Sequence, residues 1–525
     1  MKKNICLILS LFLFGGTYVF AQGEIDAYNF SQRGLHGTAR YVGMAGAFGA
    51  LGGDVTSMTT NPAGLGIYRS SELVTTLSLS SVNTKTTWLG NALDNTKTNF
   101  AFDNIAYVGY FPTGNDYGIK GWNFGFSYNR LKNYNRTYSM TGRQEYSMAD
   151  YVATITDGIT QKDLQFVKDS YDPYYSSQLA GDWLSILGYE AGFIATEEGA
   201  DNLYRSEFLD AEGRILSPES SSLRVAEKGA IDQYNFAFAT NISDRVFLGA
   251  TFVLTDLDYH KTTIYEDQFE GKDMLYLDNF LSTEGNGYAV NLGVIVRPVD
   301  FLRLGIAYNS STWYKMTDYF KGEAGSYISD YADDPNVDAS TPSNSYFEYE
   351  LKTPDRWLFS LAGIFGQNAL VSVDYELTNY KNMKLKDRDG YELSPNKDIK
   401  SDFKSSGVLR VGAEYKVTPQ FSVRAGGAWM NSPLRDEFKN GLKEVMTAGT
   451  LPHYTIDKGV SHYTIGLGYR FTPQFYTDLA CVYSTHKEDV YAFSNVFVDD
   501  VPVYSTPASM KTNTTRVSLT LGYKF

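Results

Sequence analysis

The histidines of this 525-residue chain are the first residues to test for chemistry. No His-Glu-x-x-His pair and no nucleophile elbow accompanies them. His453 and His462 are placed to approach one another near the outer end of a predicted strand, where two imidazoles could bind haem or a metal. Exposed loop positions are the simpler interpretation of both. The sequence therefore predicts no catalytic residue, and we expect that the protein is not an enzyme.

Cysteines and acidic runs offer no metal or cofactor site either. Cys481 is the only cysteine outside the first 21 residues, so an internal disulfide and a thiolate cluster are both excluded. The acidic run at 329–338 lacks the ligand spacing of a calcium loop and is interpreted as solvated. We expect neither a metal nor a cofactor.

The N-terminus is typical of a secretory signal peptide, which we place at residues 1–21. Lys2 and Lys3 precede a short apolar run, and Val19 and Ala21 occupy the small-residue positions of a cleavage site. The net charge of −14 argues against nucleic acid as a partner. No later segment is apolar enough to span a membrane as a helix. An exported chain with 41 tyrosines and 47 glycines is typical of an outer-membrane β-barrel.

The last eleven residues, TRVSLTLGYKF, show the clearest strand pattern. Apolar side chains alternate strictly with polar or small ones, at Val517, Leu519, Leu521, Tyr523 and Phe525. The terminal aromatic, Phe525 with Tyr523 beside it, resembles the signal that outer-membrane barrels present to the barrel-assembly machinery. The alternative is an ordinary half-buried strand at the end of a soluble sandwich.

Tight turns alternate with long acidic segments along the chain. The turns lie near 241–244, 298–300, 366–368, 418–420 and 472–474. Short periplasmic turns and long outer loops are the arrangement of an outer-membrane barrel, whose contacts are with outer-membrane lipid. We therefore expect an all-β, antiparallel transmembrane barrel over residues 72–525. Its fourteen predicted strands begin near residues 72, 101, 121, 232, 246, 286, 301, 355, 369, 406, 421, 461, 475 and 514.

Residues 22–71 precede the first strand and are rich in small side chains. Asp54 is placed to cap a short helical turn, and Pro62 to end it. From Ala39 to Asp54 the chain reads ARYVGMAGAFGALGGD, and Asn61-Pro62-Ala63-Gly64-Leu65 follows.

At these residues the chain resembles the FadL/TodX family of outer-membrane transporters for long-chain fatty acids and other hydrophobic compounds. The resemblance implies a fourteen-stranded barrel with an N-terminal hatch inside the lumen. It implies that substrate enters through the outer loops and leaves sideways beside the hatch. The residues assigned to the hatch are Gly52, Gly53, Asp54, Asn61, Pro62, Ala63 and Gly64.

The longest predicted outer loop, 131–231, contains an apolar stretch at helical spacing. Such a helix must bury its apolar face, either against a lipid-like ligand or against the barrel rim. The candidate ligand-binding residues are Leu179, Trp183, Leu184, Leu187 and Phe193.

The function predicted from these features is transport of hydrophobic small molecules such as fatty acids, with a dry apolar pocket above the hatch. Three alternatives stay open. Some barrels of the FadL superfamily act as shuttles in type IX secretion, and their hatches are similar. Polar lumen-facing residues would also suit an aqueous porin, and His453 with His462 would suit haem uptake.

Overall fold

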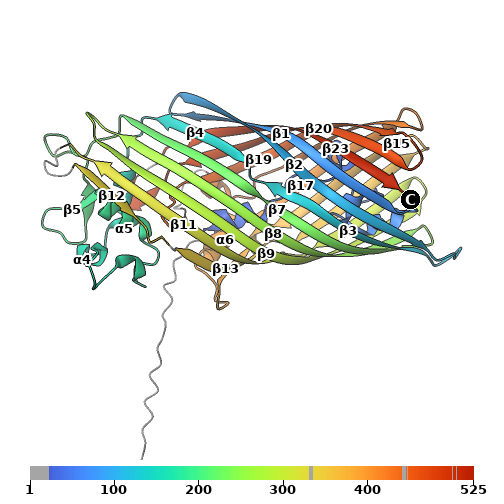
Figure 1. The fold of residues 1–525 in the computed structure, drawn as a ribbon, viewed down its shortest axis with the longest axis horizontal. Helices are drawn as coiled ribbons and strands as arrows, with labels where there is room; N and C mark the ends of the chain where they lie inside the picture. Colours follow the sequence, from blue (N-terminus) through green and yellow to red (C-terminus); the bar gives the residue numbers. More distant parts are fainter. Residues whose placement is uncertain are drawn as a thin grey trace, which may run out of the picture.

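The computed structural model describes residues 23–329, 335–343, 345–439, 445, 447, 449–498, 501–503 and 505–525. The predicted signal peptide, residues 1–21, lies outside this range. Within the described residues, fourteen antiparallel strands form one closed barrel, since β1 (Glu72–Trp88) pairs with both β2 (Asn91–Pro112) and β23 (Ala508–Lys524). The barrel is elongated, with its long loops at one end and the C-terminus among short turns at the other (Figure 1). The prediction of a fourteen-stranded β-barrel is confirmed.

Four of the fourteen strands are each interrupted once, so they carry two labels. These are β3 (Ile119–Asn133) with β4 (Arg136–Gly142), β10 (Leu302–Asn309) with β11 (Trp313–Tyr327), β13 (Tyr346–Lys352) with β14 (Arg356–Phe365), and β15 (Ala369–Asn379) with β16 (Lys384–Asp387). The remaining strands are β7 (Ser220–Ile242), β8 (Val246–Gln268), β9 (Met274–Val299), β17 (Ser405–Lys416), β18 (Phe421–Met430), β19 (Tyr454–Arg470) and β20 (Phe475–Tyr491).

The strand starts predicted at the short-turn end agree closely with the structure, whereas several starts at the outer end do not. β1 begins at Glu72 and β8 at Val246, as expected. β7 begins at Ser220 rather than near 232, and β9 at Met274 rather than near 286. The outer halves of these strands project beyond the lipid, so one face is not required to be apolar and the alternation fades.

The expected alternation of short and long connections is only partly correct. Each short turn predicted from the sequence joins two strands at the C-terminal end of the barrel. At the outer end, however, β1 and β2 are joined by two residues, Leu89 and Gly90, and both adopt positive φ angles. The β8–β9 connection is also short, at 269–273. Two of the long loops expected from the sequence are therefore extended hairpins.

The outer surface of the barrel carries the apolar residues predicted for the lipid face. On the last strand, Val517, Leu519, Leu521 and Tyr523 are all at least 40% exposed. An apolar belt that faces outward from every strand is stable only against lipid. No helix in the described part of the chain is long and apolar enough to cross a membrane.

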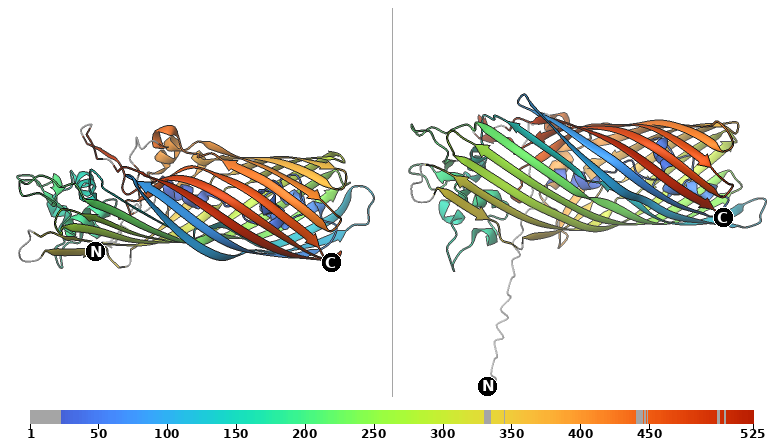
Figure 2. Two further views of the ribbon diagram at one scale, coloured as in Figure 1. Left: turned by 90° about the horizontal axis from the view of Figure 1, so that it is seen from above. Right: turned by 45° about the horizontal axis from the view of Figure 1, so that its top comes forward.

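The outer loops hold most of the remaining short elements, which gather at one end of the barrel (Figure 2). Between β4 and β7 lie α3 (Met148–Thr156), α4 (Gln161–Leu164), η3 (Pro173–Tyr175), α5 (Trp183–Glu190), β5 (Ile194–Thr196) and β6 (Tyr204–Ser206). The other loops contain β12 (Asn336–Ser340), η4 (Tyr380–Asn382), α6 (Asn396–Asp402), α7 (Asp436–Lys439), β21 (Val496–Val498) and β22 (Val501–Val503).

Residues 23–71, called here the N-terminal segment, run inside the barrel. The segment contains α1 (Glu24–Ser31), α2 (Ala39–Gly43), η1 (Val55–Met58) and η2 (Pro62–Ile67). Asp54 accepts a hydrogen bond from the Thr56 amide, so the predicted cap at the start of η1 is present. Pro62 begins η2, and η1 has already ended at Met58.

Candidate functional site

The predicted hatch residues lie where the N-terminal segment packs on the barrel wall. Asn61 is 1% exposed; its Oδ1 accepts from the Ala63 amide, and its Nδ2 donates to the Gly49 carbonyl at 2.6 Å. The same Nδ2 lies 3.4 Å from the Val294 carbonyl of β9. One amide side chain therefore caps η2, ties two parts of the segment together and reaches the wall.

Glycines of the wall make this close approach possible. A Cβ placed on Gly249 of β8 would lie 2.5 Å from the Ala63 amide nitrogen, and one on Gly412 of β17 would lie 2.5 Å from the Met44 carbonyl. Gly293 and Gly305 face Asn61 and Gly49 in the same way. These inward-facing glycines of the wall thus form the surface on which the N-terminal segment packs.

Gly52 and Gly53 have a different role, inside the segment itself. Both adopt the left-handed conformation, with φ of 60° and 67°. A Cβ on Gly52 would lie 2.7 Å from the Gly64 Cα, and the Gly53 amide donates to the Gly64 carbonyl at 3.0 Å. The glycine pair therefore allows the α2 region and η2 to touch along their backbones.

Charged groups tie the segment to the wall on its periplasmic side. Arg40 of α2 donates to Glu414 of β17, which also binds Arg424, and Arg424 binds Asp478 at 2.6 Å. These four side chains line a pocket of about 880 Å³ on the periplasmic side of the segment, called here the periplasmic pocket. Because buried ion pairs are expensive to separate, this network favours a segment that stays in place.

A second cavity, of about 350 Å³, lies between α1 and the barrel wall. Its volume falls in the range of small-molecule sites. α1 contributes Ile25, Asp26, Tyr28 and Asn29 to the lining, and wall residues from strands on several sides of the barrel complete it. This cavity is the candidate ligand site.

The lining of this cavity is not the dry apolar surface expected from the sequence. Seven cationic side chains and five carboxylates face it, interspersed with tyrosines. They are Arg33, Lys132, Arg136, Lys261, Arg356, Arg410 and Arg516, with Asp26, Glu227, Glu376, Asp457 and Glu488. The prediction of an apolar pocket above the hatch is therefore wrong for this cavity.

Four of the five histidines line the same cavity: His36, His453, His462 and His486. The interpretation of His453 and His462 as exposed loop residues is therefore wrong, since His453 is buried and His462 lies on β19. His453 Nε2 lies 3.0 Å from the Tyr138 hydroxyl, and burial lowers the pKa of this histidine well below its usual range. His462 Nδ1 lies 2.6 Å from the Ser484 hydroxyl. Among the described residues, no group of three or more His, Cys, Asp or Glu side chains has the arrangement of a metal site.

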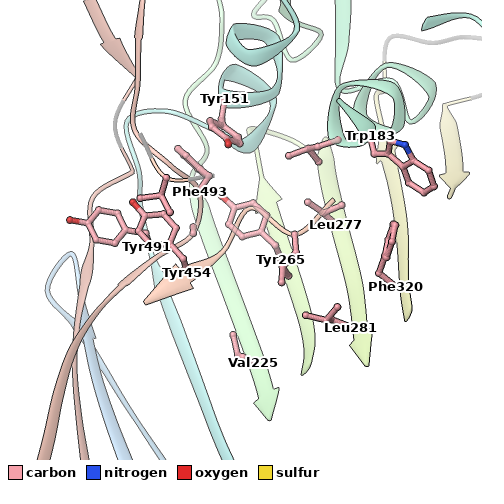
Figure 3. Packing of buried hydrophobic residues seen from close by; sticks show 14 of the residues in the cluster. Tyr151, Trp183, Val225, Tyr265, Leu277, Leu281, Phe320, Tyr454, Tyr491 and Phe493 are labelled. Carbon is pink, nitrogen blue, oxygen red and sulfur yellow. The ribbon is translucent and has the colours of Figure 1, made fainter. Parts of the chain in front are cut away.

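The predicted ligand-binding residues of the long loop lie elsewhere. Leu179, Trp183, Leu184, Leu187 and Phe193 are all at most 6% exposed and do not line the cavity. The Trp183 ring packs edge-on against Tyr174 and Phe320, at centroid distances of 5.0 and 5.2 Å. Figure 3 shows Trp183 and Phe320 side by side within the larger outer cluster. This is the packing against the barrel rim that was the alternative interpretation, and ligand binding by these five residues stays a prediction.

The barrel wall beside the cavity is not continuously hydrogen-bonded. β2 pairs with β3 only from Asn104 to Pro112, and β4 pairs with β7. Among the described residues, no backbone pairing joins positions 91–103 of β2 to β3 or β4. Side chains bridge the interval instead: Asn99 Nδ2 donates to the Asn135 carbonyl at 3.2 Å. Asn99 and Asn135 both line the cavity, so the cavity reaches this interruption.

The barrel, its apolar belt and its short periplasmic turns define the class of the protein, which is an outer-membrane β-barrel protein. Residues 269–525 match the family model described as "Outer membrane protein transport protein (OMPP1/FadL/TodX)". The resemblance to the FadL/TodX family is therefore confirmed.

Solved structures agree with this fold. The chain is similar to a Pseudomonas aeruginosa FadL homologue, with a TM-score of 0.53, 13% identity, and coverage of 94% of this chain and 99% of that one. A deltaS2 mutant of the TodX monoaromatic hydrocarbon channel gives a TM-score of 0.50 at 12% identity, with coverage of 94% and 99%. At these identities the likeness concerns the fold alone. No curated protein sequence matches the chain.

Proposed function

We propose that the protein carries hydrophobic or amphipathic small molecules across the outer membrane. The observation that carries the proposal is the cavity between α1 and the wall, which adjoins the interruption between β2 and β4. The family model and the barrel fold support transport of hydrophobic compounds as the general activity. Long-chain fatty acids are the finer assignment that we propose from the resemblance.

The N-terminal segment acts in this proposal as a hatch. It occupies the lumen between the cavity and the periplasmic pocket. Two of its side chains, Asn61 and Arg40, form hydrogen bonds or ion pairs with the barrel wall. About eight strands make a barrel that side chains alone can fill, so a barrel of fourteen needs a further occupant to stay closed. Substrate that reaches the cavity therefore needs a route other than straight through the segment.

The interrupted wall supplies that route. Backbone pairing closes a barrel wall with a regular ladder, whereas this interval is bridged by side-chain hydrogen bonds, donated by Asn91, Asn95 and Asn99 of β2. Each of these hydrogen bonds is worth about 0.5–1.5 kcal/mol. Separating such a contact is a modest cost compared with unzipping a ladder. We propose that substrate leaves the cavity sideways here, between β2 and the β3–β4 junction, toward the membrane.

The test joins the two edges covalently. In a background with Cys481→Ser, Asn99→Cys with Asn135→Cys is bridged by a short bifunctional thiol reagent, and fatty-acid uptake into proteoliposomes is measured before and after reduction of a cleavable bridge. We expect uptake to fall at least tenfold when bridged and to recover on cleavage.

The matched control bridges a part of the wall that is already closed. Thr251 of β8 and Asn291 of β9 are direct partners in a continuous ladder, so Thr251→Cys with Asn291→Cys should leave uptake unchanged. Equal uptake by the bridged and unbridged Asn99/Asn135 variant would contradict lateral exit. Absence of uptake by the unmodified protein, for every hydrophobic probe, would contradict transport itself.

A further inference from the structure

The cations that line the cavity are not all neutralised by its carboxylates. Glu227 lies directly opposite both Arg136 and Lys261 in the sheet, but it binds Arg136 and accepts from the Tyr259 hydroxyl. Among the described residues, Lys261 forms no ion pair and no hydrogen bond, although it is only 9% exposed. Its side chain is therefore largely buried, and Glu227 and Asp26 act on it only through space, without a direct contact.

Lys132 of β3 is the second cation of this kind. Its Nζ donates to the Asn29 carbonyl, the Asn29 side chain and the Gln32 side chain at 2.8–2.9 Å, and all three acceptors are neutral. Its donors are thus satisfied by α1 and the residue that follows it, but among the described residues no carboxylate oxygen lies within 4.0 Å of its Nζ. Lys132 and Lys261 lie on the third and fifth strands of the barrel.

Arg33, which follows α1, is the third. It has no hydrogen bond or ion pair among the described residues, and the charged groups that act on it most strongly are Arg356 and Glu376. Glu376 is already engaged, since its carboxylate lies 3.1 Å from Arg410 and 3.8 Å from Arg356. These partners belong to the eighth to tenth strands, so Arg33 lies on a different side of the cavity from the two lysines.

None of the other carboxylates of the cavity contacts these three cations directly, although Asp26 acts on Lys261 through space. Asp457 accepts from Tyr28 at 2.8 Å and contacts His486 at 3.2 Å, and Glu488 contacts Arg136 at 2.5 Å. Asp26 accepts from the Gly23 amide at the start of α1. A buried cation without an anion is unfavourable, and a bound acidic group removes that cost while it makes charge-assisted hydrogen bonds.

We propose that the cavity binds an amphipathic dianion, with one acidic group on the side of the cavity that carries Lys132 and Lys261 and a second at Arg33. Tyrosines of the lining, among them Tyr134, Tyr138 and Tyr259, contact the apolar part of the ligand in this proposal. The inference rests on the proposed function for the identity of the site, and it narrows the cargo from hydrophobic compounds in general to those with two separated acids.

The experiment measures binding rather than transport. Purified full-length protein in detergent is titrated calorimetrically with dodecanol, dodecanoate and dodecanedioate, three probes that share a twelve-carbon chain. We expect dodecanedioate to bind at least tenfold more tightly than dodecanoate, and dodecanol to bind most weakly. Because the contacts are ionic, the preference for the diacid should shrink as the salt concentration rises.

Variants of the cationic residues test which of them contact the acidic groups of the ligand. Lys261→Met and Arg33→Gln should each weaken dodecanedioate binding by about tenfold to a hundredfold, the range expected for one charged hydrogen bond, and leave dodecanol binding unchanged. Arg303→Gln is the matched control, because Arg303 is a lumen cation that lines the periplasmic pocket instead. Heat-modifiable migration of each variant verifies a folded barrel.

Three outcomes would overturn the proposal. They are equal affinity for dodecanol and the diacid, equal affinity for the monoacid and the diacid, and wild-type affinity in both cation variants. Failure of the proposed function is a separate result, in which the diacid binds as expected to the purified protein but no probe enters proteoliposomes.

Discussion

Gly249 offers the sharpest test of whether the wall glycines hold the N-terminal segment in place. Its φ is not positive, so a larger residue introduces no backbone strain, and the effect of Gly249→Val is steric. The new Cβ would lie 2.5 Å from the Ala63 nitrogen, whereas ordinary contact begins at 3.4 Å. The segment must therefore retreat by about 0.9 Å or more, the difference between these distances.

That retreat has an energetic consequence. Overpacking of this kind costs about 1–3 kcal/mol, which shifts an equilibrium by about fivefold to 150-fold. Movement of η2 also strains the Asn61 contacts to Gly49 and Val294. We expect a barrel that assembles normally but opens more often, with more frequent conductance steps in planar bilayers, greater sensitivity of cells to large hydrophilic antibiotics, and faster proteolysis of residues 23–71.

Gly363→Val is the matched control. Gly363 lies on β14, and the atoms nearest to its added Cβ belong to the Phe365 ring, an exposed side chain that can move. This variant should conduct like the wild type. If Gly249→Val also shows wild-type conductance and full protection of the N-terminal segment, the wall glycines do not seat a hatch and the reasoning fails.

Four further outcomes are expected. Phe525→Ala should lower outer-membrane abundance, because it removes the terminal aromatic ring of the closing strand, which packs against Tyr523 at a centroid distance of 5.2 Å; normal abundance on immunoblots would contradict this. Trp183→Ala should lower the free energy of unfolding of the outer loop by about 3–5 kcal/mol and make this loop sensitive to protease, while the barrel stays heat-modifiable. Unchanged fatty-acid binding by this variant would contradict ligand binding by the loop. Deletion of residues 22–53 should leave an inserted but leaky barrel, measured as bilayer conductance. Burial raises the pKa of Glu24 from 4.5 to about 8, so between pH 4.5 and about 8 the carboxyl is protonated when α1 is docked and ionised when α1 is undocked. Docking of α1 therefore weakens as the pH rises through this window. Glu24→Gln should abolish this pH dependence, measured by proteolysis of residues 23–71 at a series of pH values.

The local alternation of apolar and polar residues was sufficient to predict the strands of the barrel wall. Lipid requires an apolar residue at every second position, so the strand ending in Val517, Leu519 and Leu521 was recognisable without any knowledge of its partners. The start of β1 at Glu72 and the cap at Asp54 depend on neighbours within a few residues, and both were predicted correctly. The outer extent of β7 was not, because a strand beyond the lipid has no obligatory apolar face.

The interior depended on contacts between residues far apart in the chain. A polar residue on a lumen face looks the same in sequence whether it meets water, an ion-pair partner or the N-terminal segment. Lys261 and Arg33 are separated by more than two hundred positions, and only closure of the barrel around α1 brings them to one cavity. The five apolar residues of the outer loop had to be buried, as their spacing indicated, but the choice between a ligand and the barrel rim was made by tertiary packing. The sequence by itself thus determined the membrane-facing shell, because lipid imposes a periodic rule, whereas the character of the cavity was decided by the tertiary structure, because pairing of charges across a lumen follows no local period.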